Sequence, residues 1–456
     1  MALAADVANR AAPAGAVRRR LWGSRPRDAA RTLSVLVGLT ATLPIDLVVT
    51  AGALLRRAPQ PAARLAAQPR TVLVSGGKMT KALHLARAFH LAGHRVVLAE
   101  SAKYRFTGHQ FSRAVDAFYR TPEPTDPRYP HVLADIIVRE GVDVFVPVSS
   151  PAASVPEAAV HQLVGGRCEV LHGSAALIAA LDDKGDFSRL CASLDLPVPQ
   201  SVLITDAVEV ERFAFVPGRS YVLKRLAYNP VGRTDLTPLR HDTPGHNLAF
   251  ARSLGISPAD PWLLQEFLDG QEYCTHATLR NGVVTVYGCC ESSAVQLNYR
   301  HVDKPAIRSW VECFAQATGV TGQISFDFIE GADGRGYAIE CNPRTHSAIT
   351  MFHDHPDVAH AYLTDGHPTI TPLPDSTPTY WIYHELWRLL RGPDRMRRLK
   401  VITQGRDAIF AAWDPLPYLG VYHLQIPALL ISSLRHRRGW RRIDFNIGKL
   451  VETGGD

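Results

Sequence analysis

The sequence predicts an open parallel α/β sheet followed by two α+β lobes. Early in the chain, the apolar runs "TVLVSGG" and "HRVVLAE" flank a helical pattern that ends at a glycine, which is typical of a strand–helix–strand unit. After Pro197 the pattern changes to short strands, and the dipeptides Asn281-Gly282 and Asp333-Gly334 lie between apolar runs as hairpin turns do. Parallel strands need helical crossovers whereas hairpins build antiparallel sheets, so we expect two architectures along the chain.

The length of the chain and its proline-rich breaks indicate several domains. The 456 residues, 46% of them hydrophobic, have room for about three domains of ordinary size. A Pro- and Ala-rich linker, "RRAPQPAARLAAQPR", separates a basic, apolar leader from the body, and Pro197 and Pro199 mark the next boundary. The expected divisions are leader and linker 1–69, parallel-sheet domain 70–196, small α+β lobe 197–269, second α+β lobe 270–375 and C-terminal extension 376–456.

Composition excludes several classes of protein. The net charge of +7 is concentrated near the two ends, and no strand or helix interleaves basic with aromatic residues, so we expect no nucleic-acid partner. Seven cysteines without a C-x-x-C spacing argue against a disulfide framework and a structural zinc site, which favours a reducing, cytoplasmic compartment. His353 and His355 have ligand-like spacing, but "HDHP" at a helix start is more typical of capping than of zinc binding.

Two apolar segments raise the question of a membrane. The stretch 32–55 contains one charge, Asp46, and one proline, and as a helix it would measure about 36 Å, enough to cross a hydrocarbon core of about 30 Å. A second apolar segment, 416–434, is followed by "RHRRGWRR". The central aspartate makes a span marginal. Two interpretations stay open: the segments pack on each other as an ordinary buried pair, or 32–55 and 416–442 attach the protein peripherally to the cytoplasmic face of a membrane.

The parallel-sheet domain carries polar residues where such sheets bind ligands. We expect its strands in "TVLVSGG", "HRVVLAE", "VDVFVPVSS" and "CEVLHG", with helices between them. Ligands bind at the carboxyl ends of parallel strands, and there the sequence places Ser75, Gly76, Gly77, Lys78 and Glu100. The glycine pair matches neither the dinucleotide fingerprint nor the P-loop, so it does not predict a phosphate loop.

The second half of the chain predicts a small lobe, a flap and two hairpins. Short strands in "SVLIT", "SYVLKRL" and "WLLQEFL" surround a polar loop, 227–243, which we interpret as a flap. A hairpin turning at Asn281-Gly282 and a helix over about 305–318 come next. The acidic hairpin "SFDFIEGADGRGYAIECNP" follows, and "YWIYHELWRLL" predicts an amphipathic helix in the extension.

The acidic hairpin predicts two opposed carboxylates. A two-residue turn at Asp333-Gly334 would pair Asp327 with Glu340, with their Cβ atoms about 5 Å apart. Side chains alternate along a strand, so the apolar residues would share a buried face: Phe326, Phe328, Ile339 and Cys341. The polar residues would share the opposite face: Ser325, Asp327, Glu340 and Asn342. Opposed carboxylates repel, and a divalent cation such as Mg²⁺ would cancel the repulsion. A solvated face with an accidental pair is the alternative.

Four elements in this order resemble the ATP-grasp ligases, in which two α+β lobes close on ATP. They are Lys184 after "LDD", Lys224 at the end of a strand, "QEFLDGQEY" between the lobes, and the acidic hairpin with its "D…ExN" spacing. The resemblance covers about 70–365.

The resemblance implies a role for each matched residue. Lys184 and Lys224 would hold the ATP phosphates, and Arg344 would face the transferring phosphoryl group, with Lys224 also counted as catalytic. The other implied roles are adenine contacts from the backbone of Glu266, Phe267 and Leu268, ribose contacts from Glu272, and two Mg²⁺ ions, with Mn²⁺ as a substitute, on Asp327, Glu340 and Asn342.

Within the superfamily the likeness is greatest to the mycosporine-glycine synthases. Stretches such as "SGGKMTKALHLAR", "TGQISFDFI" and "ECNPRTHSAITMFHDHPDVA" carry it. It implies ATP-dependent coupling of glycine to the cyclohexenone 4-deoxygadusol through a phosphorylated intermediate. Candidate substrate residues lie beside the metal strands: His276, Ser292, Ser293, His346 and Ser347. Two rivals stay open, an ATP-grasp carboxylate–amine ligase acting through an acyl phosphate and a non-catalytic nucleotide-binding scaffold.

Overall fold

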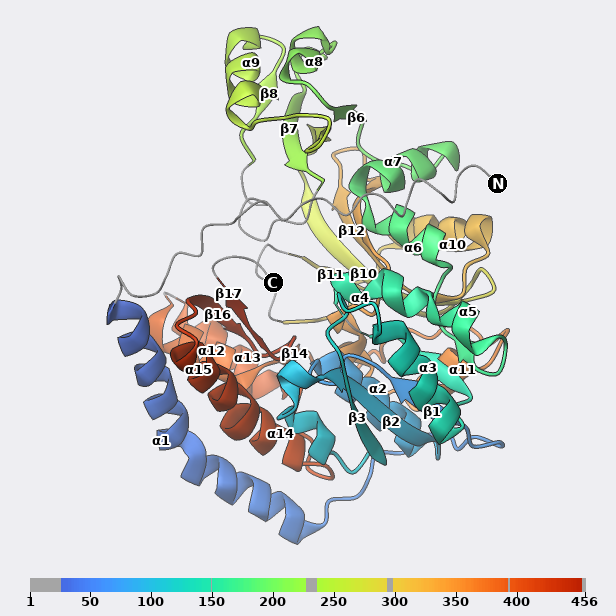
Figure 1. Ribbon diagram of the computed structural model, residues 1–456, viewed down its shortest axis with the longest axis vertical. Coiled ribbons are helices and arrows are strands. Elements are labelled where there is room, and N and C mark those ends of the chain that lie inside the picture. Colours follow the sequence, from blue (N-terminus) through green and yellow to red (C-terminus); the bar gives the residue numbers. More distant parts are fainter. Residues whose placement is uncertain (1–25, 149, 227–235, 293–297, 393, 453–456) are drawn as a thin grey trace.

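The computed structural model describes residues 26–148, 150–226, 236–292, 298–392 and 394–452. Three sheet-centred bodies follow one another along the long axis in Figure 1: the small lobe at the top, an antiparallel sheet in the middle and a parallel sheet below. The C-terminal helices and the N-terminal helix α1 (Pro26–Arg56) lie beside the parallel sheet. The expected open parallel sheet followed by two α+β lobes is therefore confirmed.

The parallel sheet has the order β3-β2-β1-β4-β5, with every pair parallel. Its strands are β1 (Thr71–Val74), β2 (Arg95–Ser101), β3 (Ala117–Thr121), β4 (Val144–Val146) and β5 (Glu169–Val170). Alternate residues of β1 enter two cores: Val72 and Val74 pack with α2 (Thr80–Leu91), whereas Leu73 packs with α3 (Tyr129–Glu140). Short helices complete the domain: η2 (Ala102–Tyr104), η3 (Gly108–Phe111), α4 (Pro151–Ala158) and α5 (Val160–Val164).

The small lobe is a four-stranded antiparallel sheet with its own core. The order is β6-β9-β7-β8, from β6 (Ser201–Ile204), β7 (Ser220–Arg225), β8 (Leu239–Arg240) and β9 (Trp262–Phe267). Helices α8 (Ala207–Arg212) and α9 (Pro244–Ser253) cover it, and its core includes Val210, Tyr221 and Leu264. Residues 227–235 of the expected flap lie outside the described residues.

The middle sheet has the order β11-β10-β12-β13 and is antiparallel. Its strands are β10 (Gln271–Arg280), β11 (Val283–Glu291), β12 (Gly322–Glu330) and β13 (Gly336–Asn342). The predicted turn is confirmed, since Arg280 pairs with Val283 and both Asn281 and Gly282 have positive φ. The predicted helix is also confirmed as α10 (Pro305–Thr318), and with α6 (Ala175–Asp182) and α7 (Lys184–Ser193) it covers one face.

The C-terminal extension shares its core with the parallel-sheet domain. Trp381, Tyr422, Ile426 and Leu430 are buried in the same cluster as Val72. The elements after β13 are η5 (Ser347–Phe352), α11 (Val358–Leu363), β14 (Thr379–Tyr380), α12 (Ile382–Arg391), α13 (Arg395–Gln404), β15 (Arg406–Asp407), α14 (Leu416–Gly420), the π-helical η6 (Val421–Gln425), α15 (Ile426–Arg435), β16 (Trp440–Asp444) and β17 (Lys449–Glu452).

The two apolar segments noted in the sequence contact each other, because α1 packs on α14, η6 and α15. Asp46 lies at the centre of this contact. It accepts hydrogen bonds from the hydroxyl groups of Tyr383 (2.6 Å) and Tyr418 (3.0 Å), and it lies 2.7 Å from Nε2 of His423. Burial alone would raise the pKa of Asp46, but these hydrogen bonds outweigh burial and hold the pKa below its ordinary value. The two segments therefore contact each other as the first interpretation expects, but only 17% of the apolar window of α1 is buried, and peripheral attachment stays a prediction.

Candidate functional site

The acidic hairpin brings its two carboxylates together as predicted. Asp327 on β12 pairs directly with Glu340 on β13. The predicted two-residue turn is wrong, however, because the ladder closes at Glu330 and Gly336 and leaves a five-residue loop, 331–335. A register shift between Asp327 and Phe328 then adds one residue on β13, which restores the predicted pairing.

This bulge also corrects one predicted face. Phe326, Phe328 and Cys341 are buried against Trp310 as expected. Phe328 pairs with Ala338, which is buried, while Ile339 is the extra residue and is only half-buried. The buried face is therefore continuous, and Asp327 and Glu340 stand together on the opposite face.

Electrostatics around Asp327 indicate an acidic site that its cationic neighbours compensate only in part. Its pKa is raised to about 7, first by burial and then by the negative charge of Glu340. Glu272 at the start of β10 also raises this pKa, whereas Arg344 and Lys184 lower it. Two carboxylates and the Asn342 amide oxygen are ligands of the kind that Mg²⁺ prefers, and a divalent cation would offset the repulsion that the pKa reports. These residues therefore fit a magnesium ion.

Hydrogen bonds hold the hairpin side chains in place. Asn342 donates its Nδ2 to Asp327 Oδ2 (3.3 Å), and Arg344 Nη2 donates to Asn342 Oδ1 (2.5 Å). Arg344 also forms an ion pair with Asp182 (3.2 Å), at the end of α6. Arg344 is thereby fixed beside the acidic pair, in a position to place positive charge near any group bound there.

Lys184 reaches the site because a helix begins at that residue. The Asp183 side chain caps α7 by accepting hydrogen bonds from the backbone N–H groups of Gly185 and Asp186. The Lys184 ammonium then lies 3.2 Å from Glu340 Oε1. A cation bound to Glu340 would release this lysine for an anionic group such as a phosphate.

Lys224 approaches the same site from the small lobe. It lies near the end of β7, and its Nζ donates to Gln265 Oε1 on β9 (2.6 Å). Burial lowers the pKa of Lys224, and the charges of Glu340, Glu272 and Asp327 oppose that shift. The small lobe and helix α7, which packs on the middle sheet, therefore each contribute a lysine to one acidic centre.

The segment joining the lobes offers few free groups at Glu266. Its backbone N–H donates to the Gln200 carbonyl (2.8 Å), and its carboxylate lies 3.0 Å from Arg219. Phe267, exposed, ends β9, and Leu268 begins the short connection to β10. The predicted adenine contacts therefore depend mainly on Phe267 and Leu268, with exposed Glu272 just downstream.

The predicted substrate histidines are held in internal hydrogen bonds. Buried His276 lies 3.1 Å from the Tyr362 hydroxyl through Nε2, and its Nδ1 accepts from the backbone N–H of His346 (3.3 Å). His346 accepts from the N–H of Ala348 at the start of η5 (3.2 Å). Burial lowers both pKa values, that of His346 to about 3, so both rings are neutral. Their role as substrate residues stays a prediction.

The three serines fall in different places. Ser347 exchanges hydrogen bonds with Asn446 of the C-terminal extension (2.7 Å and 3.0 Å). Half-buried Ser292 donates its backbone N–H to the carbonyl of Glu272 (2.9 Å). Ser293 lies outside the described residues. Of these, Ser292 lies beside the acidic centre, because its partner Glu272 raises the pKa of Asp327.

One residue of this region, Lys81, was missed by the sequence reasoning. Its buried ammonium donates to the carbonyl of Thr345 (2.5 Å), next to Arg344. Burial first, and then the charge of Arg344, lower the pKa of Lys81 to about 7. The signal in the sequence was a lysine on the first turn of the helix that follows the glycine pair, three residues after Lys78.

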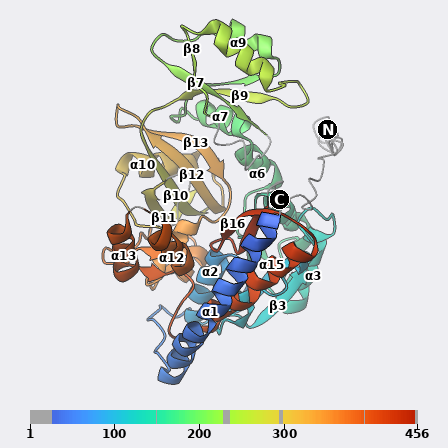
Figure 2. The same cartoon turned by 90° about the vertical axis from the view of Figure 1, so that its left-hand side faces the viewer.

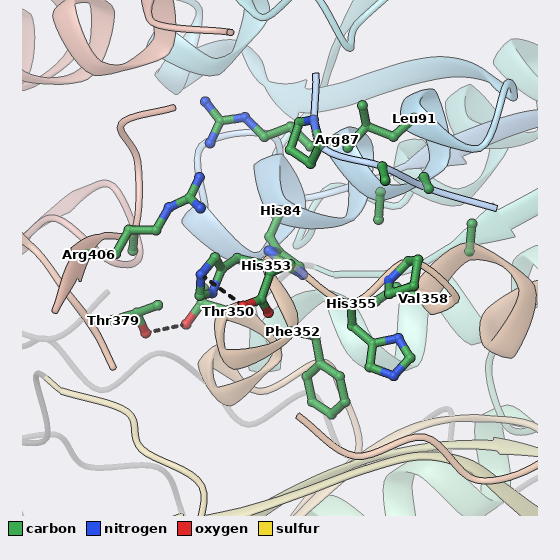
Figure 3. A pocket seen from close by; sticks show the side chains of 18 of the residues that line it. His84, Arg87, Leu91, Thr350, Phe352, His353, His355, Val358, Thr379 and Arg406 are labelled. Atoms are coloured by element: carbon green, nitrogen blue, oxygen red, sulfur yellow. Dashed lines mark hydrogen bonds and ion pairs between the residues drawn. The ribbon is translucent and has the colours of Figure 1, made fainter. Parts of the chain in front are cut away.

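A separate small cavity, about 40 Å³ in volume, lies away from these residues. Figure 3 shows His84 and Arg87 of α2, His353 near η5, and Arg406 of the extension lining it. His353 is 3.7 Å from Asp354. In the described part of the chain, no group of three or more His, Cys, Asp or Glu side chains is arranged to hold a metal, so the acidic centre contributes only two carboxylates.

Comparison with solved structures identifies the fold. No family model and no curated protein sequence matches the chain. Two structures of N5-carboxyaminoimidazole synthetase from Staphylococcus aureus are similar to it, one of them complexed with ADP, each with a TM-score of 0.50. Identities are 14% and 13%, and the matches cover 70% of this chain and 82% and 83% of theirs. The chain has the ATP-grasp fold.

Proposed function

We propose that this chain is an ATP-dependent, carbon–nitrogen bond-forming ligase of the ATP-grasp type. The observation that carries the proposal is the acidic centre, where Asp327 and Glu340 are paired and lysines arrive from α7 and β7. A nucleotide-binding scaffold without turnover has no need of two opposed carboxylates with an arginine fixed beside them. This favours an enzyme over the scaffold.

The cofactors in this proposal are ATP and two Mg²⁺ ions, with Mn²⁺ as a substitute. Asp327, Glu340 and Asn342 would hold the metal, which would neutralise phosphate charge. Lys184 and Lys224 would bind the phosphates, Phe267 and Leu268 would contact adenine, and Glu272 would contact the ribose. Arg344 would stabilise charge that develops during phosphoryl transfer.

For the substrates we propose 4-deoxygadusol and glycine, on the sequence likeness described above. The γ-phosphoryl group of ATP would pass to an oxygen of the cyclohexenone. The glycine amine would then add to the ring carbon that bears this oxygen. Phosphate would leave with the oxygen as the amine loses a proton. The products are mycosporine-glycine, ADP and phosphate. Buried, uncharged His276 and His346 would position the strand that faces these substrates.

A carboxylate–amine ligase acting through an acyl phosphate is the second candidate. Its nucleotide and metal residues would be the same, and the similar solved structures are of a synthetase. The cytoplasm is the proposed site of action for either enzyme, in agreement with seven cysteines of which none forms a disulfide in the described part of the chain. Contact of 32–55 and 416–442 with the cytoplasmic face of a membrane belongs to the same proposal.

Substrate omission separates these candidates. Purified protein is mixed with ATP, Mg²⁺, 4-deoxygadusol and glycine, and ADP and product mass are followed while each component is left out in turn. The proposal predicts ADP release that needs the cyclohexenone, with a product equal to the two substrates minus water. ADP release that ignores the cyclohexenone but responds to a carboxylate would support the second candidate. No turnover with any substrate would favour the scaffold.

A further inference from the structure

Helix α1 buries a narrow side on which polar residues lie together with Leu39 and Ala53, and it exposes a broad apolar side. Thr32, Asp46 and Thr50 are buried against the body. Along the opposite side the exposed residues are large and apolar, namely Leu33, Val37, Ile45, Val48 and Leu55. Val37 is 68% exposed and Val48 is 73% exposed. An apolar stripe of this length is unusual on the surface of a monomer and indicates an interaction surface.

The polar contacts show how α1 is attached. Arg31 donates to the carbonyls of Trp440 and Arg441, and its guanidinium stacks over the Trp440 ring at 4.0 Å. In the middle of the helix, Asp46 accepts the hydrogen bonds from Tyr383 and Tyr418. These bonds tie the helix along the body, between α12 and α15 in Figure 2. Asp28–Arg56 is long and apolar enough to span a bilayer, with a mean hydropathy of 1.9, but a span would break these contacts.

The apolar surface continues onto α12. Tyr383 of α12 reaches α1, and Leu386, Trp387 and Leu390 follow it at helical spacing, on one side of the helix. All three are exposed, and Arg391 stacks over the Trp387 ring at 4.0 Å. Tryptophan is enriched at the headgroup level of membranes, and arginine is also an interfacial anchor.

Basic residues border both ends of this surface. Exposed Arg56 and Arg57 follow the last turn of α1. At its other end, beside Arg31, lies the segment after α15, with exposed side chains at Arg435, Arg437, Arg438 and Arg441. An apolar stripe framed by arginines complements a bilayer surface of anionic lipids, where the acyl boundary receives the stripe and the headgroups receive the arginines.

We propose that α1, with α12, docks the protein on an anionic lipid surface and lies in the plane of the interface. The inward side of 416–434 is core, as Tyr422, Ile426 and Leu430 are buried. The outward side of this segment exposes Leu416, Leu424 and Ile431 by 36–41% each, less than Val37 and Val48 of α1. The main apolar contribution to docking therefore comes from α1 and α12, and the contribution of 435–442 is electrostatic. This inference is independent of the proposed reaction.

Vesicle flotation tests the proposal with the purified full chain. We expect the protein to bind preformed vesicles of phosphatidylcholine with 30% phosphatidylglycerol. Its affinity should fall about tenfold or more on vesicles of phosphatidylcholine alone or in high salt. Because the attachment is peripheral, bound protein should exchange onto vesicles that are added later. Val37→Asp/Val48→Asp should reduce binding at least about tenfold, because it puts charge on the stripe. Val138→Asp is the matched control, since Val138 is 62% exposed on α3, and it should bind as the wild type does.

Other outcomes would overturn the proposal. Binding that survives Val37→Asp/Val48→Asp, in a variant with unchanged far-UV circular dichroism and melting temperature, excludes the stripe. A wild-type protein that does not float excludes the lipid surface. A stable dimer in light scattering that the same double variant converts to monomer would assign the stripe to a second copy of this chain. Arg435→Glu/Arg441→Glu should remove the preference for anionic lipid, and a preserved preference would exclude the electrostatic part.

Discussion

At the residue scale, the central feature is two carboxylates that the fold forces together. Asp327 and Glu340 are direct partners on β12 and β13, and repulsion with burial raises the pKa of Asp327 to about 7. Direct cross-strand partners of like charge destabilise a sheet. A bound cation would neutralise this repulsion. In the free protein, Lys184 neutralises part of it through its ion pair with Glu340.

Replacing Glu340 by glutamine should abolish ATP turnover, with a loss of about 10²-fold or more, because one negative metal ligand is lost. Stabilisation of the protein by Mg²⁺ with ATP, seen as a rise in melting temperature, should fall as well. Glu330→Gln is the matched control on β12, the other strand of the same hairpin, where Glu330 forms an ion pair with Lys304. Full activity of Glu340→Gln would refute the metal assignment.

Lys81 should make stability depend on pH in a defined direction. Its folded pKa, about 7, lies below its ordinary value of 10.5. Between about pH 7 and pH 10 the unfolded chain therefore binds one proton more than the folded chain. The free energy of unfolding is lowered by the full amount below pH 7, and it recovers as the pH rises toward 10. Lys81→Met should be more stable than the wild type by about 2–4 kcal/mol at pH 6, and the difference should vanish near pH 10.

Denaturant unfolding of the two proteins from pH 6 to pH 10 measures this difference. Met79→Leu, two residues away and equally buried, controls for repacking of the same turn. A difference that does not change with pH would show that the Lys81 ammonium keeps its ordinary pKa.

At the element scale, the hairpin shows what the sequence could and could not predict. An assumed two-residue turn at Asp333-Gly334 predicted the pairing of Asp327 with Glu340, and alternation of apolar residues supported that register and predicted the buried Phe326 and Phe328. The five-residue loop and the bulge at Ile339 were not predicted. The longer loop shifts the pairing by one residue, and the bulge shifts it back. The alternation of apolar residues depends only on the final register, so it could not reveal either feature.

The attachment of α1 gives the prediction for this scale. Asp46→Asn should destabilise the protein by about 2–4 kcal/mol, since a buried acceptor of several hydrogen bonds loses its charge and leaves donors unsatisfied. Asp28→Asn, half-buried on the same helix, should change stability little. The melting temperature of each variant checks this. The depressed pKa of Asp46 implies that its contribution is present at neutral pH and is lost on acidification below about pH 4.

At the scale of the whole molecule, the order of the bodies was predictable and the path of the extension was not. Strand–helix alternation and hairpin signals are local, and they located the parallel sheet and both lobes. The extension folds back over distances that no local pattern reports: Thr80 donates its backbone N–H to the carbonyl of Asn446 (2.9 Å), and the Trp381 indole donates to the Thr80 hydroxyl (3.0 Å). The same reason hid Lys81 and Asn446 from the site prediction.

The small lobe should behave as a separate, nucleotide-sensitive unit. It has its own core, and Lys224 brings it to the acidic centre. Mg²⁺ with ATP should slow hydrogen exchange in β7 and β9 by about tenfold or more, while the buried strands β1 and β4 change little. Lys224→Met should remove this protection and leave the exchange of β1 unchanged. Equal protection of β1 and β9 would contradict lobe closure.

The central proposal for the reaction is that ATP activates an oxygen of the cyclohexenone for replacement by glycine, whereas the second candidate activates a carboxylate. An isotope transfer tests it most directly: 4-deoxygadusol carrying ¹⁸O at the reacting oxygen is converted with ATP, Mg²⁺ and glycine, and the phosphate is examined by ³¹P NMR. We predict that the label appears in inorganic phosphate, because phosphate leaves with that oxygen. If the phosphate carries no label from the cyclohexenone, but does carry ¹⁸O when a labelled carboxylate substrate is used instead, the account is contradicted and the protein is an acyl-phosphate ligase.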